Sequence, residues 1–506
     1  MAEADRYTIR SGLFTGSELM ERAGAAIMDV VLRDFGDAPR VHVLCGPGNN
    51  GGDGYVVARL LVERGVDVRL HALAPPKPET DAAQAAQRWR GDVLPLDAFA
   101  PDENDCVIDA IFGAGARGML PEVVQDALVT ASRHQARMVA VDLPSGIDGD
   151  TGAARFAVQC AATVTFFAKK PGHLLHPGRE TCGTLHVADI GVRQEPDAAD
   201  YHDVFENGPD VWAPWFSPDD AEIDTHKYQR GHVAVFSGSR HSAGASRLSA
   251  LAAQRAGVGA VTLLGSANAI DIHASHVTSI MTRVVTDESA KAVLRGLPHC
   301  RAVVLGPGYR ETDKLRTHAR SVLEPAEGTH RKALVLDADG ITAFKDHQND
   351  LFDIGRLSTR PRLILTPHAG EFARLFPDLA DDRAIGKLEQ ARRAAERANA
   401  VVVFKGPDTV IAAPRREDLE EPVAAINVHA SPALATAGSG DVLAGLIAGF
   451  VARGICAFDA ACAAVWMHGE AGMRAGTSPT AEDIIAHIGD ALQHVASLFE
   501  TQRGHI

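Results

Sequence analysis

Short apolar segments that alternate with amphipathic stretches constrain the fold of this chain more than any other feature. In the first run of this pattern, Val57, Leu60, Leu61 and Arg64 have the spacing of a helix with one apolar face. Strands that alternate with helices form mostly parallel sheets covered on both faces. The sequence therefore predicts an α/β domain with strand candidates Val41–Cys45, Val66–Leu70, Cys106–Ile111, Val139–Asp142 and Thr163–Phe167.

The alternation stops between Arg193 and Gly231 and then restarts. This stretch is dense in Pro, Asp and Glu and has no clear period, which is typical of a linker, although Trp212, Trp215 and Phe216 indicate that part of it packs. A helix is predicted over 244–256, and the later strand candidates are His232–Phe236, Ala260–Leu264, Ala302–Leu305, Ala333–Leu336, Leu363–Leu365 and Ala400–Phe404. We predict two α/β domains in series, residues 1–212 and residues 213–506.

Length and composition agree with this division. A chain of 506 residues is longer than one hydrophobic core usually serves, and 46% apolar with 23% charged residues is ordinary for a globular protein. Lys and Arg total 50 against 65 Asp and Glu, a net charge of −15 that leaves no broad basic face for nucleic acid. The seven cysteines form no CxxC pair, which favours reduced thiols over disulfides or a zinc site.

Neither the N-terminal sequence nor the most apolar helix candidate indicates a membrane segment. The N-terminal sequence is polar and acidic, unlike a secretory signal. The most apolar helix candidate, from Val442 onward, meets Arg453 too soon to span a bilayer. We expect a cytoplasmic protein that contacts neither membrane nor nucleic acid.

A glycine-rich motif follows the first strand. Val41–Cys45 runs into GPGNNGGDG, Gly46–Gly54, whose backbone amides can hold an anion at the start of a helix. Three of its glycines formally fit GxGxxG, so a plain dinucleotide-binding loop is the alternative. That motif also requires an acidic residue at the end of the second strand, where this chain has His71 or Ala72.

Two further loops carry polar groups after strands. One is DAIFGAGARG, which begins at Asp109, and the other is VDLPSGID, with Asp142, Ser145 and Asp148. A single Asp at a strand end is more often a turn or a helix cap. Because ligands of open α/β sheets bind beyond the carboxyl ends of strands, three such loops together predict one pocket.

These motifs, with KKPGHLLHPGRETCGTLHVADIG over 169–191, resemble the NAD(P)H-hydrate epimerase domain, and the resemblance covers roughly residues 10 to 195. It implies a potassium ion held by Asn50, Asp109 and Ser145, whose oxygens suit a hard cation. It also makes Asp142 the expected acid/base group at C6 of the nicotinamide ring. The implied contacts to the hydrated nucleotide are Asn49, Asn50, Gly51, Gly52, Asp53, Gly113, Ala114, Gly115, Ala116, Arg117, Gly118, Met119 and Asp142.

A second site is indicated by AGSGD, Ala437–Asp441, which opens an apolar helix. Glycine amides at a helix start stabilise phosphate charge, and an Asp there can deprotonate an attacking hydroxyl. A tight turn capped by Asp441 is the structural alternative. Further motifs follow strands: LGPG (305–308), LDADG (336–340), TPHAGE (366–371) and KGPDT (405–409), and GASRLSALAAQRAGVGAVTLL (244–264) begins the domain.

Together these motifs resemble the ADP- or ATP-dependent NAD(P)H-hydrate dehydratase domain, a relative of ribokinase-like small-molecule kinases, over roughly residues 225 to 500. The family often has Leu-Gly where this chain has Tyr309–Arg310, DADAL for DADGI, and Thr for Ser439. The fold implied is a Rossmann-like three-layer α/β/α domain followed by a ribokinase-like α/β domain. The implied contacts are Ala245, Gly308, His368 and Asp441 to the hydrated nucleotide, and Lys405, Gly406, Pro407, Asp408, Thr409 and Gly440 to ADP.

The resemblance implies repair of the hydrated nucleotides NADHX and NADPHX by a homo-oligomer. Asp441 is the predicted base that lets the 6-hydroxyl attack ADP, with the glycine amides and Mg²⁺ stabilising the transferred charge. The first domain would convert the R epimer into the S epimer that the second uses. A small-alcohol or vitamin-precursor kinase shares AGSGD but does not explain TPHAGE with KGPDT, or the motifs in front. A sensor without chemistry should have lost a carboxylate, yet Asp142 and Asp441 are both present.

Overall fold

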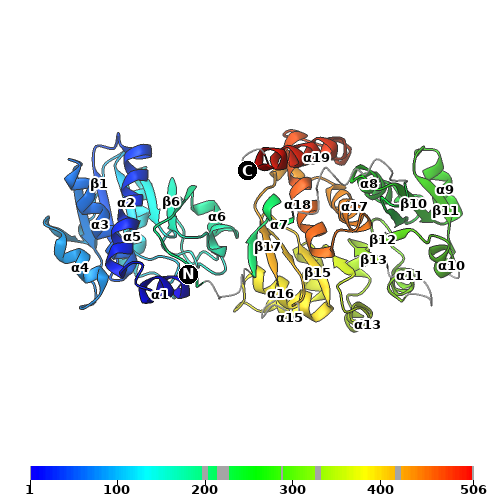
Figure 1. The fold of residues 1–506 in the computed structure, drawn as a ribbon, viewed down its shortest axis with the longest axis horizontal. Coiled ribbons are helices and arrows are strands. Elements are labelled where there is room, and N and C mark those ends of the chain that lie inside the picture. The colour runs from blue at the N-terminus through cyan, green and yellow to red at the C-terminus, as the bar shows by residue number, and fades with distance from the viewer. Residues whose placement is uncertain are drawn as a thin grey trace. The chain divides into compact units, whose positions relative to one another are not determined.

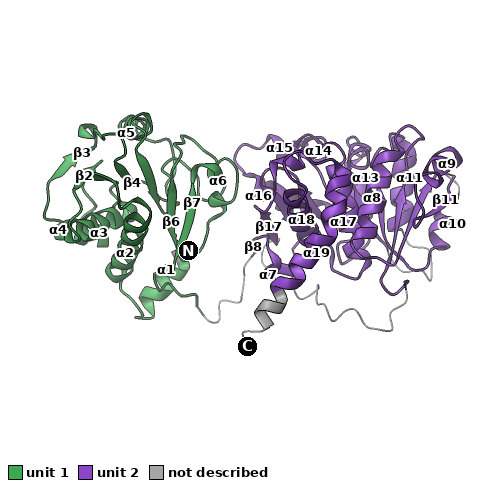
Figure 2. Ribbon diagram, turned by 90° about the horizontal axis from the view of Figure 1, so that it is seen from above, with its two compact units in different colours: residues 1–201 green, residues 202–506 purple. Residues whose placement is uncertain are grey.

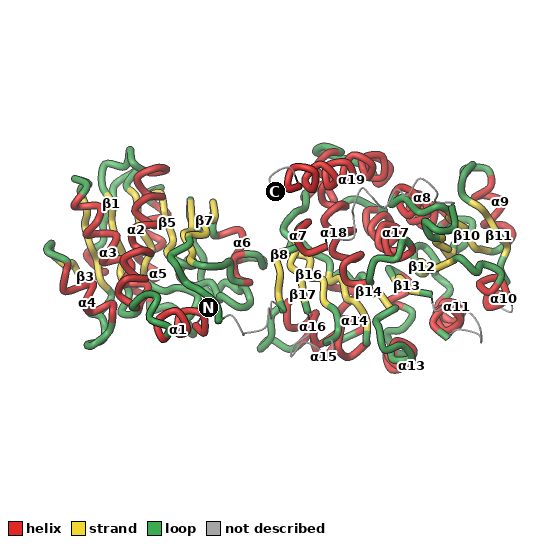
Figure 3. The backbone as a smooth tube through the Cα atoms, viewed as in Figure 1, coloured by secondary structure: helices red, strands yellow, loops and turns green. Residues whose placement is uncertain are grey.

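The computed structural model of this protein describes residues 2–195, 203–212, 227–286, 289–324, 332–415 and 423–503. Two compact units, residues 1–201 and residues 202–506, divide the chain and are coloured separately in Figure 2. Within each unit strands alternate with helices along the chain, as the tube in Figure 3 shows. The predicted fold class, two α/β domains in series, is confirmed.

The first unit, coloured blue to cyan in Figure 1, contains an entirely parallel sheet with the order β3-β2-β1-β4-β5-β6-β7. Its strands are β1 (Val41–Cys45), β2 (Val68–Ala72), β3 (Val93–Pro95), β4 (Cys106–Ala110), β5 (Arg137–Val141), β6 (Ala162–Phe166) and β7 (Thr184–Ala188). The strand order changes direction between β1 and β4, and ligands of open α/β sheets bind at such a point.

Helices cover both faces of this sheet. They are α1 (Ala2–Arg10), α2 (Gly16–Phe35), α3 (Asn49–Glu63), α4 (Asp81–Arg88), α5 (Glu122–Arg133) and α6 (Gly178–Thr181), with short 3₁₀ turns at Leu96–Ala98 and Pro171–His173. Successive side chains of a strand point to opposite faces. Val41 and Val43 of β1 therefore pack in the core formed with α2 and α3, whereas Leu44 packs in the core formed with α5.

The second unit has the sheet order β11-β10-β9-β12-β13-β14-β15-β16-β17-β8. Strands β9 to β15 are all parallel to their neighbours in this part of the sheet, up to the pairing of β14 with β15. Strand β16 is antiparallel to both of its neighbours, and β8 pairs with β17 in parallel. The bounds are β8 (Val204–Glu206), β9 (His232–Phe236), β10 (Ala260–Gly265), β11 (Met281–Val284), β12 (Cys300–Leu305), β13 (Ala333–Leu336), β14 (Leu363–Leu365), β15 (Ala400–Phe404), β16 (Thr409–Ala412) and β17 (Ala424–Asn427).

One large apolar core joins this sheet to α8, α17, α18 and α19. The alanine- and glycine-rich faces of α8 and α17 pack closely together beside the sheet, and Phe450 of α17 is completely buried. The helices are α7 (Pro209–Trp212), α8 (Ala243–Arg255), α9 (Ala267–Ala274), α10 (Ala290–Arg295), α11 (Thr312–Leu323), α12 (Asp339–Thr342), α13 (Gln348–Gly355), α14 (Ala369–Leu375), α15 (Pro377–Asp381), α16 (Lys387–Ala398), α17 (Ser439–Ala452), α18 (Ala457–Arg474) and α19 (Ala481–Arg503), with a 3₁₀ turn at Pro432–Leu434.

The units divide between residues 201 and 202, whereas the sequence placed the boundary after residue 212. The residues in between join the second unit because β8 extends its sheet and Trp212 is buried against Trp466, with ring centroids 5.9 Å apart. Trp215 and Phe216, the other aromatic residues expected to pack, lie outside the described residues.

Most predicted strands agree with the structure to within a residue or two, and the largest shift has a clear cause. The second strand begins at Val68 and not at Val66. The amide of Val66 donates to the Leu61 carbonyl at 3.1 Å and that of Gly65 to the Val62 carbonyl at 2.9 Å, which closes α3. Val66 therefore belongs to the turn that follows α3.

Within the described ranges, no helix is both long enough and apolar enough to cross a bilayer. All seven cysteine thiols are free, and only Cys456 is exposed.

Candidate active sites

The glycine motif after β1 forms the first turn of α3. The helix begins at Asn49, with Gly48 as its N-cap, so Asn49 to Asp53 are helical, earlier than the sequence suggested. A Cβ on Gly51 would collide with the Gly46 carbonyl. Glycine at this position therefore lets the helix start close to the strand, where its free amides face the carboxyl edge of the sheet.

Asp109 and Ser145 are brought together from the ends of β4 and β5. The Ser145 hydroxyl donates to Asp109 Oδ1 at 2.7 Å, and its amide donates to Oδ2 at 2.9 Å. The Ser145 oxygen also accepts a hydrogen bond from the Phe112 amide at 3.0 Å. Burial raises the pKa of Asp109 above its ordinary value, and these hydrogen bonds oppose that rise.

Asn50 joins this group through the loop after β4. A Cβ built on Gly113 would lie 3.0 Å from Asn50 Oδ1 and 2.9 Å from Asp142 Oδ2, so both oxygens face the same short piece of backbone. The Asn50 amide nitrogen is buried without a hydrogen-bond partner among the described residues. The three residues expected to hold potassium thus converge around Phe112–Gly113.

Asp142 lies directly after β5 and forms an ion pair with Lys170. The Lys170 ammonium donates to Asp142 Oδ1 at 2.6 Å and to the Thr165 hydroxyl at 2.6 Å. The Ala114 amide donates to Asp142 Oδ2 at 3.0 Å. Burial alone would raise the pKa of Asp142, but Lys170 and the two hydrogen-bond donors, Ala114 and Thr165, hold the pKa below its ordinary value.

The backbone at Asp142 is held in a conformation that a residue with a side chain rarely adopts, with φ of +65°. His173 stabilises it, because its Nδ1 accepts from the Lys170 amide at 2.8 Å and its Nε2 donates to the Asp142 carbonyl at 2.7 Å. Non-glycine residues in this region cost about 1–3 kcal/mol each and cluster at functional sites.

Two more carboxylates face the same ion pair. Asp53 of α3 interacts electrostatically with Asp142, and Asp5 of α1 with both Asp142 and Lys170. Burial raises the pKa of Asp53 well above its ordinary value, and burial also raises that of Asp5. The Lys170 charge therefore acts on Asp5 as well as on Asp142.

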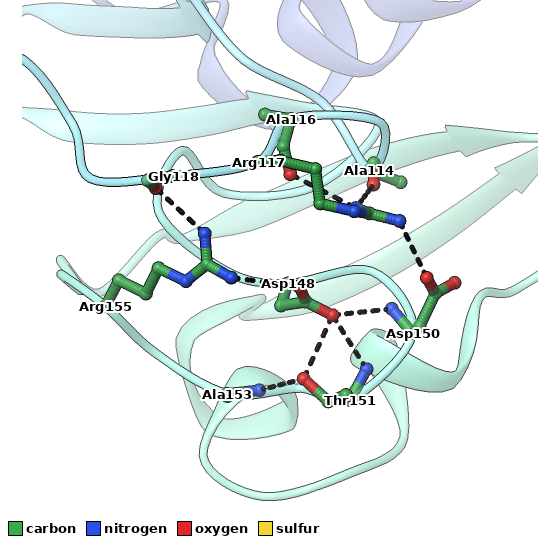
Figure 4. A network of polar contacts seen from close by, with 9 residues as sticks. All are labelled: Ala114, Ala116, Arg117, Gly118, Asp148, Asp150, Thr151, Ala153 and Arg155. Carbon is green, nitrogen blue, oxygen red and sulfur yellow. Dashed lines mark hydrogen bonds and ion pairs between the residues drawn. The ribbon is translucent and has the colours of Figure 1, made fainter. Parts of the chain in front are cut away.

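The expected substrate loop, Gly113–Met119, is tied to the loop that follows Ser145 (Figure 4). The Arg117 guanidinium pairs with Asp150 at 2.7 Å and also donates to the carbonyls of its own loop at Ala114 and Ala116. Arg155 donates to the Gly118 carbonyl at 3.0 Å. At the end of the loop, Met119 is 71% exposed and available to a ligand.

In the second unit, Asp441 lies in the first turn of α17. The helix starts after Gly438, whose φ of +88° requires glycine, and a Cβ there would crowd Leu248 and Ala481. The Ser249 hydroxyl of α8 donates to the Asp441 carbonyl at 2.8 Å. The close packing of α8 on α17 thus fixes the position of the carboxylate.

Lys405, at the end of β15, points toward this helix start. Its ammonium donates to Asp337 Oδ1 at 2.8 Å and lies 3.9 Å from Glu371 Oε2. The Thr366 hydroxyl donates to the same Asp337 oxygen at 2.7 Å. A Cβ on Gly440 would lie 3.5 Å from the Lys405 nitrogen, so the cation lies beside the amides of α17.

Burial raises the pKa of Asp441 to about 7, and the neighbouring Asp337 adds to the rise. Lys405 acts in the opposite direction but is paired with Asp337 and does not cancel the effect. A carboxylate with a pKa near neutrality can both accept and release a proton at physiological pH.

The remaining expected contacts lie around this centre. Ala245 and Gly308 touch, since a Cβ on Gly308 would be 3.3 Å from that of Ala245. His368 caps α14, accepting from the Gly370 amide at Nδ1 and facing Glu371 from Nε2 at 3.4 Å. Its side chain is half exposed and open to a ligand.

The KGPDT turn lies between β15 and β16. Its Thr409 hydroxyl donates to the Gly406 carbonyl at 3.0 Å, and Lys387 pairs with Asp408 at 2.5 Å. Burial of Lys387 lowers its pKa, and Asp408 opposes that shift. The turn is thus rigid, and Lys405 is its one side chain that reaches Asp337 and the start of α17.

Sequence reasoning did not select Lys170, Thr165 and His173 in the first unit or Asp337 in the second. Thr165 lies within the buried strand β6, and the other three residues follow buried strands inside motifs that were recognised. For Lys170 the available signal was a charged residue a few positions after β6, in KKPG.

The described residues contain no cluster of three or more His, Cys, Asp or Glu side chains that could hold a metal by themselves. The oxygens of Asn50, Asp109 and Ser145, with one carboxylate only, instead fit a monovalent cation.

Two family models match the chain. One described as NAD(P)H-hydrate dehydratase matches residues 233–494, and one described as YjeF-related protein N-terminus matches residues 16–172. The chain is 32% identical to the bifunctional NAD(P)H-hydrate repair enzyme of Escherichia coli (strain K12), over 96% of this chain and 91% of that protein. It belongs to the family of bifunctional NAD(P)H-hydrate repair enzymes.

A second member of this repair-enzyme family matches over a similar share of both chains. The relative from Moorella thermoacetica is 34% identical over 93% of this chain and 90% of its own. Among solved structures, the ADP/ATP-dependent NAD(P)H-hydrate dehydratase of Bacillus subtilis is 25% identical, with a TM-score of 0.43 over 55% of this chain and 93% of that one. A ribokinase-like superfamily protein of Enterococcus faecalis is 20% identical, with a TM-score of 0.47 over 58% and 98%.

Proposed function

We propose that this chain repairs hydrated NADH and NADPH in two steps. The first domain interconverts the R and S epimers, and the second dehydrates the S epimer with ADP, giving NAD(P)H, AMP and phosphate. Family membership supports both activities. The observation that carries the proposal is Asp441, a carboxyl with a pKa of about 7 at the start of a glycine-capped helix, beside Lys405.

The dehydration solves a leaving-group problem. Hydroxide leaves C6 poorly, whereas phosphate leaves well. Asp441 takes the proton of the 6-hydroxyl, the oxygen attacks the β-phosphorus of ADP, and the bond to the bridging oxygen breaks to release AMP. Loss of phosphate from C6 and of a proton from C5 then restores the ring double bond.

Positive charge and helix amides support the phosphoryl transfer. Lys405 and the amides around Gly440 lie together, as required to stabilise negative charge on the transferred group. The turn Lys405, Gly406, Pro407, Asp408 and Thr409 would bind ADP. Ala245, Gly308 and His368 would bind the hydrated nucleotide on the other side of Asp441.

In the first domain, the Asp142–Lys170 pair is the proposed proton carrier. C6 carries both a hydroxyl and the ring nitrogen. Removal of the hydroxyl proton by the Asp142 carboxylate, with delivery of a proton to the nitrogen from Lys170, opens the C6–N1 bond to an aldehyde. Closure from the opposite face, with the protons returned, inverts C6. The 2.6 Å contact between the two side chains permits such an exchange.

Potassium and magnesium have different proposed places. Asn50, Asp109 and Ser145 would hold K⁺, which supplies fixed positive charge and orders the loop at Phe112–Gly113. Mg²⁺ would arrive with ADP and be bound mainly through phosphate oxygens, because the described residues offer no protein cluster for it.

Absorbance at 340 nm tests both activities. The purified chain is given mixed R and S NADHX with ADP, Mg²⁺ and K⁺, and complete recovery of NADH is expected. Recovery that stops when the S epimer is exhausted would refute the epimerase. No recovery with ADP or ATP would refute the dehydratase, and a phosphorylated product that persists would indicate a kinase.

A further inference from the structure

A cavity of about 190 Å³ lies beyond the carboxyl ends of β9, β10 and β12. In the order β11-β10-β9-β12-β13-β14, the parallel strands β10 and β11 are added on one side of β9 and the strands from β12 onward on the other, so the strand order reverses between β9 and β12. This is the strand order of dinucleotide-binding sheets, which bind their ligand at the reversal. The cavity, which we call the switch-point cavity, is lined by side chains including Ser239, Arg240, Ser266, Asn268, Tyr309 and Lys314.

The switch-point cavity adjoins the substrate contacts proposed above. Gly238, which lines it, packs so closely on Gly308 that a Cβ would collide with the Gly308 carbonyl, and Gly308 touches Ala245. Along the edge of the sheet, the ADP turn lies beyond β15, Asp337 follows β13, Gly308 follows β12, and the cavity follows β9 and β10. With the nicotinamide ring at Asp441 and ADP on one side, the rest of the dinucleotide must extend to the other.

The cavity carries the chemistry of a phosphate site. Arg240 is exposed and forms no ion pair with any residue that the structure describes. The nearby charges of Lys314 and Glu311 cancel, since they pair at 2.7 Å. The end of β10 carries Ser266 and Asn268, where a dinucleotide site that binds a free ribose 2′-hydroxyl usually has an acidic residue.

The size of the cavity suits one end of a dinucleotide. Sites that enclose a complete drug-sized ligand measure roughly 300–1,000 Å³. A volume of about 190 Å³ is enough for part of a nucleotide, and Tyr309, held by a 2.8 Å hydrogen bond to His318, forms a rigid wall.

We propose that the switch-point cavity binds the adenosine 2′-phosphate end of the hydrated nucleotide, with Arg240 as the main phosphate contact. The proposal rests on the function proposed above and deepens it, because it makes the dehydratase domain select NADPHX over NADHX. Arg240 forms charge-assisted hydrogen bonds to the 2′-phosphate, assisted by the Ser239, Ser266 and Asn268 side chains.

Steady-state kinetics of the complete chain test this selection. Arg240→Gln is expected to raise KM for (S)-NADPHX by about tenfold, with kcat and the KM for (S)-NADHX changed less than about twofold. Arg255→Gln, an exposed arginine at the opposite end of α8, is the matched control and should change neither. Equal effects of Arg240→Gln on both substrates, or no effect on either, would overturn the proposal.

A binding measurement separates this proposal from the catalytic one. Calorimetry with adenosine 2′,5′-bisphosphate, in the presence of saturating ADP, should show binding that weakens about tenfold in Arg240→Gln and not in Arg255→Gln. Such binding without dehydration would support the subsite and refute the proposed activity. Dehydration without Arg240-dependent binding would support the activity and refute the subsite.

Discussion

The two sites each combine a lysine with carboxylates, buried for Lys170 and half-buried for Lys405, but they distribute the charge differently. In the first domain Lys170 contacts Asp142 directly and holds its pKa low. In the second, Lys405 is paired with Asp337, and the pKa of Asp441 rises to about 7. The same two residue types therefore produce a direct ion pair in one place and a carboxyl with a pKa near neutrality in the other.

This difference matches the chemistry proposed for each domain. A proton exchanged within a carbinolamine can move between two tightly paired groups and return. An attack on phosphorus instead needs a base that is free to accept a proton and is not already neutralised by a cation. In the proposed mechanisms, the two sites therefore differ in which carboxylate the lysine contacts.

The largest expected effect comes from replacing Asp441, the proposed base of the second site. Asp441→Asn should lower kcat of the dehydratase by about 10³–10⁴-fold, because Asp441 is the acidic residue of the first turn of α17 and the neighbouring Asp337 is already paired with Lys405. NADH recovery from (S)-NADHX measures the loss, and thermal unfolding checks the fold. The exposed Asp346→Asn serves as control. Residual activity above about a tenth of wild type would exclude Asp441 as the base.

Removal of the cation tests the paired site. Lys170→Met should slow epimerisation by about 10²-fold or more and, by leaving Asp142 buried without its partner, destabilise the first domain by about 3–5 kcal/mol. The rate of NADH recovery from pure (R)-NADHX reports epimerisation, after correction for its uncatalysed rate.

The second domain provides an internal control for Lys170→Met, since recovery from (S)-NADHX on the same chain should be unchanged. Lys170→Arg keeps the charge and separates unfolding from chemistry. If both variants epimerise at the wild-type rate, the pair has no role in proton transfer.

The pH profile sharpens the comparison further. Because Asp441 must be ionised, kcat/KM for (S)-NADHX should fall about tenfold per pH unit below about 7 and level off above it. Asp337→Asn removes a neighbouring negative charge and frees Lys405 from its partner. Both changes lower the pKa of Asp441, so the fall of kcat/KM at acidic pH should move to lower pH. If the fall of kcat/KM stays at the same pH, or moves to higher pH, this electrostatic account is wrong.

The smallest expected effect concerns the Arg117–Asp150 pair of Figure 4. Both side chains are mostly exposed, so the pair contributes little stability. Arg117→Ala should raise the epimerase KM by less than about fivefold without changing Tm, because the loop keeps its Arg155 contact. Arg155→Ala is the companion variant, and the double substitution should exceed either one. If the epimerase KM of the double variant changes by less than about twofold, the loop needs neither arginine.

Strand positions and the convergence of loops at the carboxyl edge could be predicted from the sequence, because apolar periodicity and strand ends are local signals. The Lys170–Asp142 pair could not, since it joins residues 28 positions apart across β5 and β6. The pairing of Lys405 with Asp337 across 68 positions depends in the same way on strand order. The pKa difference between the two sites follows from these pairings and was therefore out of reach.

Helix ends were the other source of error. The start of α3 within the glycine motif depends on close contact between Gly51 and Gly46, a tertiary feature. The strands β16 and β17, which pair antiparallel with each other, were also not predicted. Each has only four residues, although they are mostly buried. Their pairing to β15 and to β8 supplies the context that local periodicity lacks.

The short strand β8 forms one edge of the second domain's sheet, and short edge strands offer little backbone for further copies to pair with. It covers the backbone of β17, and Asn207 fixes it by donating to Asn427 Oδ1 and the Cys462 carbonyl, each at 2.9 Å. A fragment that starts after residue 212 would lose β8 and Trp212 together, exposing an apolar hollow and an unpaired strand edge on which further copies could stack. The domain should therefore be separated near residue 201, upstream of the segment that closes its sheet.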